Sequence, residues 1–258
     1  MNILLFLLFA VCTGTPDAGR DIHLIAHRGG VVDTRHGENT LSALQEAIRQ
    51  GYWMVEVDVR KSKDGELVVL HDDNFMRGYG VRKAVSDLTW DEIRLLHSRK
   101  GGEPPCTFAE YAAQCRGRIG VMIDCKETDD SGGFFRRMET ILVENNLLKD
   151  ALFIGSAQMK ACFKEKARIG TDRNGLKQAV EAGENVAGRY FLFEHGNELD
   201  DATVQYAESL NVPVIPTVND YHYLLKRRNS TPQSDLERLH LAGVTTFQID
   251  SAYAKFCK

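Results

Sequence analysis

Short β-type runs alternate with helical patterns along most of this 258-residue chain. This alternation constrains the fold more than any other feature, because strands separated by helices build parallel sheets from βα units. Eight such runs suffice to close a (β/α)8 barrel, and the length suits a single barrel domain. The expected strands cover residues 22–27, 54–60, 120–126, 151–157, 167–172, 189–195, 212–218 and 245–250.

Helical patterns lie between these runs. Residues 40–50 carry apolar side chains on one face and end before Gly51, a good C-cap. Thr89 and Thr107 each precede a glutamate by three residues, which is the capping-box pattern. Because 67–118 is too long for a simple connection, we expect a small insertion there, over one end of the barrel. The other expected helices cover 134–148, 201–210, 220–228 and 234–242.

The N-terminus indicates export. Residues 1–11 are almost wholly apolar, but a membrane span needs ~20 such residues, so the run fits a signal-peptide core better. We interpret 1–19 as signal peptide and short leader, and 20–258 as the functional domain, periplasmic or secreted. Cys12 is a candidate lipid-anchor site, which would make the protein a membrane-anchored lipoprotein. A buried N-terminal strand is the alternative, and no transmembrane segment is expected in the mature chain.

Charge and cysteine spacing exclude some classes of partner. A formal net charge of −4 argues against nucleic acid, whose partners usually present a basic surface. No CxxC or Cys/His spacing indicates a zinc site. Neither observation argues against a small anionic substrate held by a few local cations.

Polar residues gather at the C-terminal ends of the expected strands, which is where active sites of such barrels lie. Buried parallel strands are normally continuously apolar, so each charge in them requires a partner or a function. We interpret Asp250, at the end of the last strand, as a cap of the C-terminal segment. The candidate functional residues are His27, Arg28, Glu56, Asp58, Asp124, Lys126 and Asn219.

A hairpin is expected after the second strand. Asp64-Gly65 is a two-residue turn signal, which would pair residues whose numbers sum to 129. Asp58 would then face His71. Because side chains alternate along a strand, Glu56, Asp58 and His71 would share one face.

The carboxylates predict a metal site. Glu56 and Asp58 would repel each other unless a cation lies between them, and Asp124 on a neighbouring strand would complete an oxygen-rich site. Oxygen ligands suit Mg²⁺, Ca²⁺ or Mn²⁺. Arg28 and Lys126 flank the same region, and a metal with two such cations is a receptor for phosphate.

Two histidines complete the parts required for phosphodiester cleavage, since imidazoles exchange protons near neutral pH. His71, beside carboxylates, is favoured as the acid, and His27, beside Arg28, as the base. The order of these roles stays open at this point.

Four segments together resemble the signature of the glycerophosphodiester phosphodiesterase family, a phosphatidylinositol-phospholipase-C-like barrel. The resemblance covers nearly the whole mature chain. The segments are HRGG (27–30), ENT (38–40), EVDVRKSKDGELVVLHD (56–72) and TVND (217–220).

The resemblance implies a TIM barrel with one divalent cation, Ca²⁺ or Mg²⁺. It implies hydrolysis of a glycerophosphodiester to glycerol 3-phosphate and an alcohol in lipid and glycerol metabolism, by attack of the glycerol 2-hydroxyl and a cyclic phosphate. Carried over by position, it implies acid and base roles for His27 and His71, metal binding by Glu56, Asp58 and Asp124, phosphate binding by Arg28 and Lys126, and a site role for Glu38. Asn219, after the seventh strand, is either a further site residue or a cap of the following helix.

One departure concerns the third carboxylate, which is usually glutamate in the family and is the shorter Asp124 here. Glu127 is a substitute, but it should point away from the site. A roomier site slightly favours Ca²⁺. Two alternatives remain: a phospholipase D-like or sphingomyelinase-like enzyme, which would need an exposed apolar rim, and a non-catalytic binder of phosphate ligands.

Overall fold

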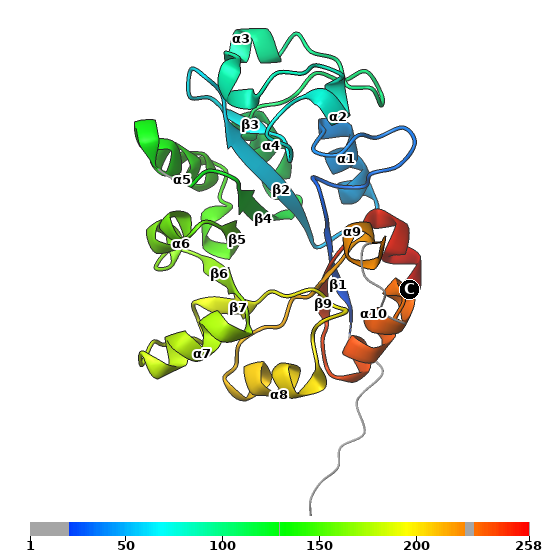
Figure 1. The fold of residues 1–258 in the computed structure, drawn as a ribbon, viewed down its shortest axis with the longest axis vertical. Coiled ribbons are helices and arrows are strands. Elements are labelled where there is room, and N and C mark those ends of the chain that lie inside the picture. The colour runs from blue at the N-terminus through cyan, green and yellow to red at the C-terminus, as the bar shows by residue number, and fades with distance from the viewer. Residues whose placement is uncertain (1–20, 129, 225–229, 258) are drawn as a thin grey trace, which may run out of the picture.

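Eight parallel strands form a curled sheet with helices packed around its outer side (Figure 1). The computed structural model describes residues 21–128, 130–224 and 230–257. Every expected strand is present, but most are shorter than expected, above all those expected over 189–195 and 212–218. The eight are β1 (His23–Ala26), β2 (Met54–Lys61), β4 (Gly120–Cys125), β5 (Leu152–Gly155), β6 (Arg168–Thr171), β7 (Tyr190–Leu192), β8 (Thr217–Val218) and β9 (Thr246–Ile249).

The strand order is β7-β6-β5-β4-β2-β1-β9-β8, with parallel pairing throughout. Isolated parallel bridges, Leu192 with Val214 and His195 with Thr217, join the two ends and close the barrel. Because Pro213 and Pro216 have no N–H to donate, the ladder there is interrupted and β8 is short. The predicted (β/α)8 fold is confirmed.

The helices expected between strands are present, and the structure adds two that were not predicted, over Ala157–Phe163 and Arg173–Glu181. Thr40 caps α1 by accepting from the Ala43 amide, and the buried face of α1 includes Leu44. One expected helix, over 134–148, ends early at Glu144, because Asn146 adopts a left-handed φ of 56°. The helices are α1 (Leu41–Arg49), α4 (Phe108–Cys115), α5 (Phe134–Glu144), α6 (Ala157–Phe163), α7 (Arg173–Glu181), α8 (Asp201–Ser209), α9 (Asp220–Leu224) and α10 (Pro232–Leu241).

The predicted insertion folds as a small unit above β2. It holds β3 (Leu67–Val69), α2 (Met76–Tyr79), a 3₁₀ turn (Val85–Asp87) and α3 (Trp90–Ile93). Its own core consists of Val68, Leu70, Phe75, Val85 and Ile93. Both predicted capping boxes, at the starts of α3 and α4, are present, although α4 belongs to the barrel rather than to the insertion.

The predicted hairpin register was wrong by one residue. Val59 pairs with Val69 and Lys61 with Leu67, so paired numbers sum to 128. The loop is three residues long rather than two, and Gly65 takes a left-handed φ of 88° at its end. Such a loop is a common alternative to the two-residue turn, and a slip of one residue moves side chains to the other face.

Side chains fill the interior of the barrel, so its two ends are separate. The inner core consists of Ile25, Met54, Met122, Leu152, Phe191 and Ile215. A larger core lies between the sheet and the surrounding helices. Within the described part of the chain, no helix has the length and apolar character needed to cross a membrane. The expected leader 1–19, with Cys12, and residues 225–228 of the expected helix 220–228 lie outside the described residues.

The loop between β1 and α1 depends on a glycine. Gly30 has a φ of 136°, and a Cβ there would lie 2.2 Å from the Ala43 carbonyl oxygen. We therefore predict that Gly30→Ala lowers the free energy of unfolding by about 3 kcal/mol or more, because backbone must move. Gly51→Ala, also at a positive φ but with open space around it, should cost only about 1–2 kcal/mol. Urea unfolding monitored by circular dichroism compares them, and equal losses would contradict the steric argument.

Candidate active site

Three carboxylates converge inside the C-terminal end of the barrel. Glu56 and Asp58 lie on the inward face of β2, each only 1% exposed, and strand register places Asp124 of β4 beside Asp58. Oxygens of the three lie within 4.8 Å of one another. Glu127 lies outside the cluster and accepts a hydrogen bond from the Lys61 amide. The structure thus brings together the three carboxylates predicted as metal ligands.

Lys126 neutralises only part of this cluster. Its Nζ lies 2.8 Å from Asp58 Oδ1 and 2.6 Å from Asp124 Oδ2. Burial opposes the charge on Lys126, but these carboxylates outweigh it and raise its pKa. Burial raises the pKa of Glu56 well above its ordinary value, and the charges of Asp58 and Asp124 raise it further. A hard divalent cation fits this donor set, since three carboxylates with one ammonium still carry excess negative charge.

Asn39 orients Asp58. Its Nδ2 donates to Asp58 Oδ2 at 2.7 Å, and the Asp58 amide donates back to Asn39 Oδ1 at 3.3 Å. Asn39 is 1% exposed and has a left-handed φ of 56°, a conformation that asparagine tolerates. No role was predicted for Asn39, although it lies in the ENT segment. Glu56 is held similarly, by the Arg28 amide at 2.8 Å.

His27 is held by a carboxylate from the last strand. Its Nδ1 lies 2.6 Å from Asp250 Oδ1, and its Nε2 lies 4.0 Å from Glu56 Oε2. Burial acts to raise the pKa of Asp250, but the hydrogen bond and charge of His27 outweigh burial and lower it. The interpretation of Asp250 as a cap was wrong for its side chain, which bonds His27 and the Asp220 amide instead of the following turn.

His71 is held by the insertion. Its Nδ1 lies 2.8 Å from Asp72 Oδ1, and Arg77 bonds both Asp72 and Glu38. Glu38 also accepts from Arg28 at 3.0 Å, so a chain of ion pairs connects the first barrel loop to His71. The Arg77 hydrogen bond is the main reason that the pKa of Asp72 is lowered. No spacing pattern connects Arg77 with Glu38, since the two residues meet only in the fold.

The wrong hairpin register does not remove His71 from the cluster. Burial acts to raise the pKa of both Asp58 and Asp124, and the nearby Lys126 and His71 act against it; the pKa of Asp58 is lowered on balance, whereas that of Asp124 is raised. His71 follows β3 rather than lying within it, so the strand register alone does not decide which face it takes. Yet the premise that separated the roles of the two histidines fails, because each imidazole has a carboxylate partner.

A cavity of about 370 Å³ lies beside His27. Asn219, which is 7% exposed, donates from Nδ2 to Thr217 Oγ1 at 3.0 Å and lines this cavity. Four predicted site residues line this cavity together with Asp250: His27, Arg28, Glu38 and Asn219. Lys126 and His71 do not line this cavity, so Arg28 is the cation placed to hold an anion beside His27.

Comparison with solved structures agrees with this architecture. A glycerophosphodiester phosphodiesterase from Agrobacterium tumefaciens superimposes with a TM-score of 0.71 at 18% identity, covering 92% of this chain and 100% of that one. A phosphodiesterase from Oleispira antarctica, solved with the product sn-glycerol-3-phosphate, gives 0.72 at 19% identity, covering 90% and 94%. At such low identity these matches show a shared fold.

Curated relatives match over shorter segments. A human lysophospholipase D is 42% identical over 124 residues, 48% of this chain and 37% of that protein. A probable glycerophosphodiester phosphodiesterase of Mycobacterium tuberculosis is 40% identical over 81 residues, 31% of this chain and 30% of its own. The chain therefore spans about a third of the length of these relatives. The model of the glycerophosphoryl diester phosphodiesterase family matches residues 27–250, and the chain belongs to that family.

Proposed function

We propose that this protein hydrolyses glycerophosphodiesters to glycerol 3-phosphate and an alcohol. The observation that carries the proposal is the acidic cluster flanked by two carboxylate-held imidazoles, with Arg28 and Lys126 beside it. A receptor that only bound phosphate would not need buried carboxylates, which repel it. Family membership and the solved relative with glycerol 3-phosphate support the same reaction.

A divalent cation, Ca²⁺ or Mg²⁺, would be held by Glu56, Asp58 and Asp124. When bound, it would supply Lewis-acid polarisation of a phosphoryl oxygen and offset the charge of the cluster. Asn39 would fix the orientation of Asp58, in the way that outer residues orient metal ligands.

In the proposed reaction, Arg28 and Lys126 bind the phosphate oxygens. One imidazole removes the proton from the glycerol 2-hydroxyl, which attacks phosphorus, and the other protonates the departing alcohol oxygen. Water then opens the cyclic phosphate, with the two proton transfers reversed. Asp250 and Asp72 bind the Nδ1 atoms, which leaves the Nε2 atoms of His27 and His71 for these transfers.

A lysophospholipid is the second candidate substrate. The cavity beside His27 has Val32, Tyr221 and Ala252 in its wall, and Tyr221 is 66% exposed. This apolar rim would suit an acyl chain on the glycerol, and the human relative is named lysophospholipase D. Parallel assays with glycerophosphocholine, glycerophosphoethanolamine and lysophosphatidylcholine decide between the two substrate classes.

We propose that the chain is exported through the apolar run at its N-terminus, with residues 20–258 as the functional domain. Mass spectrometry of protein from the native host should find an N-terminus near Gly14, or a lipid-modified Cys12. Recovery of an intact Met1 as the main species would refute export.

Metal dependence has a direct test. Dialysis against EDTA should abolish hydrolysis, and Mg²⁺ or Ca²⁺ should restore it. Asn39→Ala, which frees Asp58, should raise the metal concentration for half-maximal activity by about 10–100-fold. Asn146→Ala is the matched control, because Asn146 has the same φ of 56° but lies far from the cluster in the chain. Full activity after exhaustive EDTA dialysis would remove the metal from the mechanism.

Proton transfer is tested on the two imidazoles. His27→Ala and His71→Ala should each lower kcat by about 10²–10⁴, the usual scale for a general acid or base. His97→Ala in the insertion should change kcat little. A p-nitrophenyl diester needs little acid assistance, so it should rescue the acid variant far more than the base variant and thereby assign the roles. If both variants keep near-wild-type kcat on natural substrates, the protein is a phosphate binder rather than this hydrolase.

A further inference from the structure

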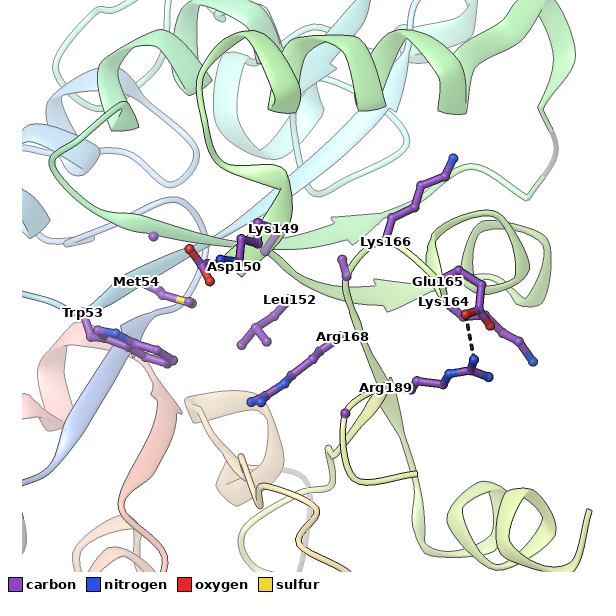
Figure 2. A pocket seen from close by; sticks show the side chains of 14 residues that line it. Trp53, Met54, Lys149, Asp150, Leu152, Lys164, Glu165, Lys166, Arg168 and Arg189 are labelled. Carbon is purple, nitrogen blue, oxygen red and sulfur yellow. Dashed lines mark hydrogen bonds and ion pairs between the residues drawn. The ribbon is translucent and has the colours of Figure 1, made fainter. Parts of the chain in front are cut away.

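A second cavity, with a volume of about 730 Å³, opens at the opposite, N-terminal end of the barrel (Figure 2). This volume lies within the range of sites that bind small organic molecules. Its wall includes apolar surface from Trp53, Met54 and Leu152. No residue of the candidate active site lines it, and the packed inner core separates the two ends.

Arg168 is the unusual residue of this cavity. It occupies the first position of β6, two residues before Gly170, where a Cβ would meet Ile154 and Phe191 of the barrel interior. Because side chains alternate, Arg168 belongs to the same inward-facing set, but at the open end of the barrel, where it is exposed. No hydrogen bond or ion pair connects its guanidinium to any residue in the described part of the chain.

The other charges of the wall are largely balanced. Three cations already have carboxylate partners: Arg189 with Glu165 at 2.7 Å (Figure 2), Lys164 with Glu184 at 3.3 Å and Lys166 with Glu139 at 2.7 Å. Two further cations, Lys149 and Arg168, line the cavity. Only one further carboxylate of the wall, Asp150, is available to balance them. The cavity has an excess of positive charge beside an apolar surface.

We propose that this cavity binds a small organic phosphate. Its phosphate group lies on Arg168 and Lys149, and its organic part packs against Trp53 and Leu152. Guanidinium matches phosphate through paired hydrogen bonds, and two cations suit a phosphomonoester charge of roughly −1.5 to −2. Figure 2 shows the Arg168 guanidinium directed toward the side of the cavity where the Trp53 indole lies, near Leu152. One ligand can thus contact both the Arg168 guanidinium and the Trp53 indole.

Tryptophan fluorescence tests the proposal, because the chain has only two tryptophans, Trp53 and Trp90. Trp90→Phe leaves Trp53 as the single reporter. Titration of this protein with glycerol 3-phosphate and with inorganic phosphate at constant ionic strength should change the Trp53 emission saturably. Adding Arg168→Met should weaken binding by about 10-fold or more, the loss expected for a charged hydrogen-bonding partner.

Matched variants separate this site from the active site. Arg189→Gln removes a wall arginine that already has a carboxylate partner and should change the affinity little. Lys126→Met should lower hydrolysis and leave the Trp53 response intact. Arg168→Met should weaken the Trp53 response and leave hydrolysis intact. The thermal melting of each variant confirms its folding. The readout is independent of hydrolysis, so failure of the proposed reaction would not affect it.

Three results would overturn the proposal. One is equal affinity of the folded Arg168→Met protein and its parent. Another is the absence of any saturable Trp53 response to the soluble phosphates. The third is a response to vesicles of phosphatidylcholine and phosphatidylglycerol without a response to soluble phosphates, which would make this end of the barrel a membrane-binding surface.

Discussion

The mutual repulsion of three carboxylates, two of them fully buried, is the interaction on which the active end of this protein depends. Glu56 and Asp58 project inward from one strand, where water cannot screen them, and the register of the next strand adds Asp124. Such a cluster is stable only if other groups compensate it. Lys126, the Arg28 amide and Asn39 do so in part, and the remaining negative charge is what makes a divalent cation a fitting ligand.

The same compensation determines how the loops above the strands are arranged. The first loop must approach β2 closely enough for its amides and Asn39 to reach the carboxylates, and Gly30 permits this because a side chain there would strike α1. The insertion is joined to this loop through Arg77 and Glu38. Each histidine is held through its Nδ1 by a carboxylate outside the cluster, His27 by Asp250 and His71 by Asp72.

Much of the site was predictable because its residues lie in or next to strands with clear patterns. Carboxylates inside an apolar run, as at Glu56 and Asp58, indicate a compensating partner whatever the fold. The hairpin was less predictable, since Asp64-Gly65 fits both a two-residue and a three-residue loop, and the choice depends on packing of the insertion. Asp250 was misassigned for a similar reason: its partner, His27, is 223 residues away in the chain and adjacent only after the barrel closes.

The sequence by itself determined the barrel, through its alternating periodicity, and the types of group at the strand ends, because local patterns encode both. It also determined the family, through four segments in a specific order. Only the tertiary structure decided which groups meet. Closure of the barrel placed Asp250 on His27, the fold of the insertion brought Arg77 to the Asp72 that bonds His71, and the start of β6 left Arg168 lining a cavity. Contacts between distant residues depend on how strands align and loops pack, which no local pattern records.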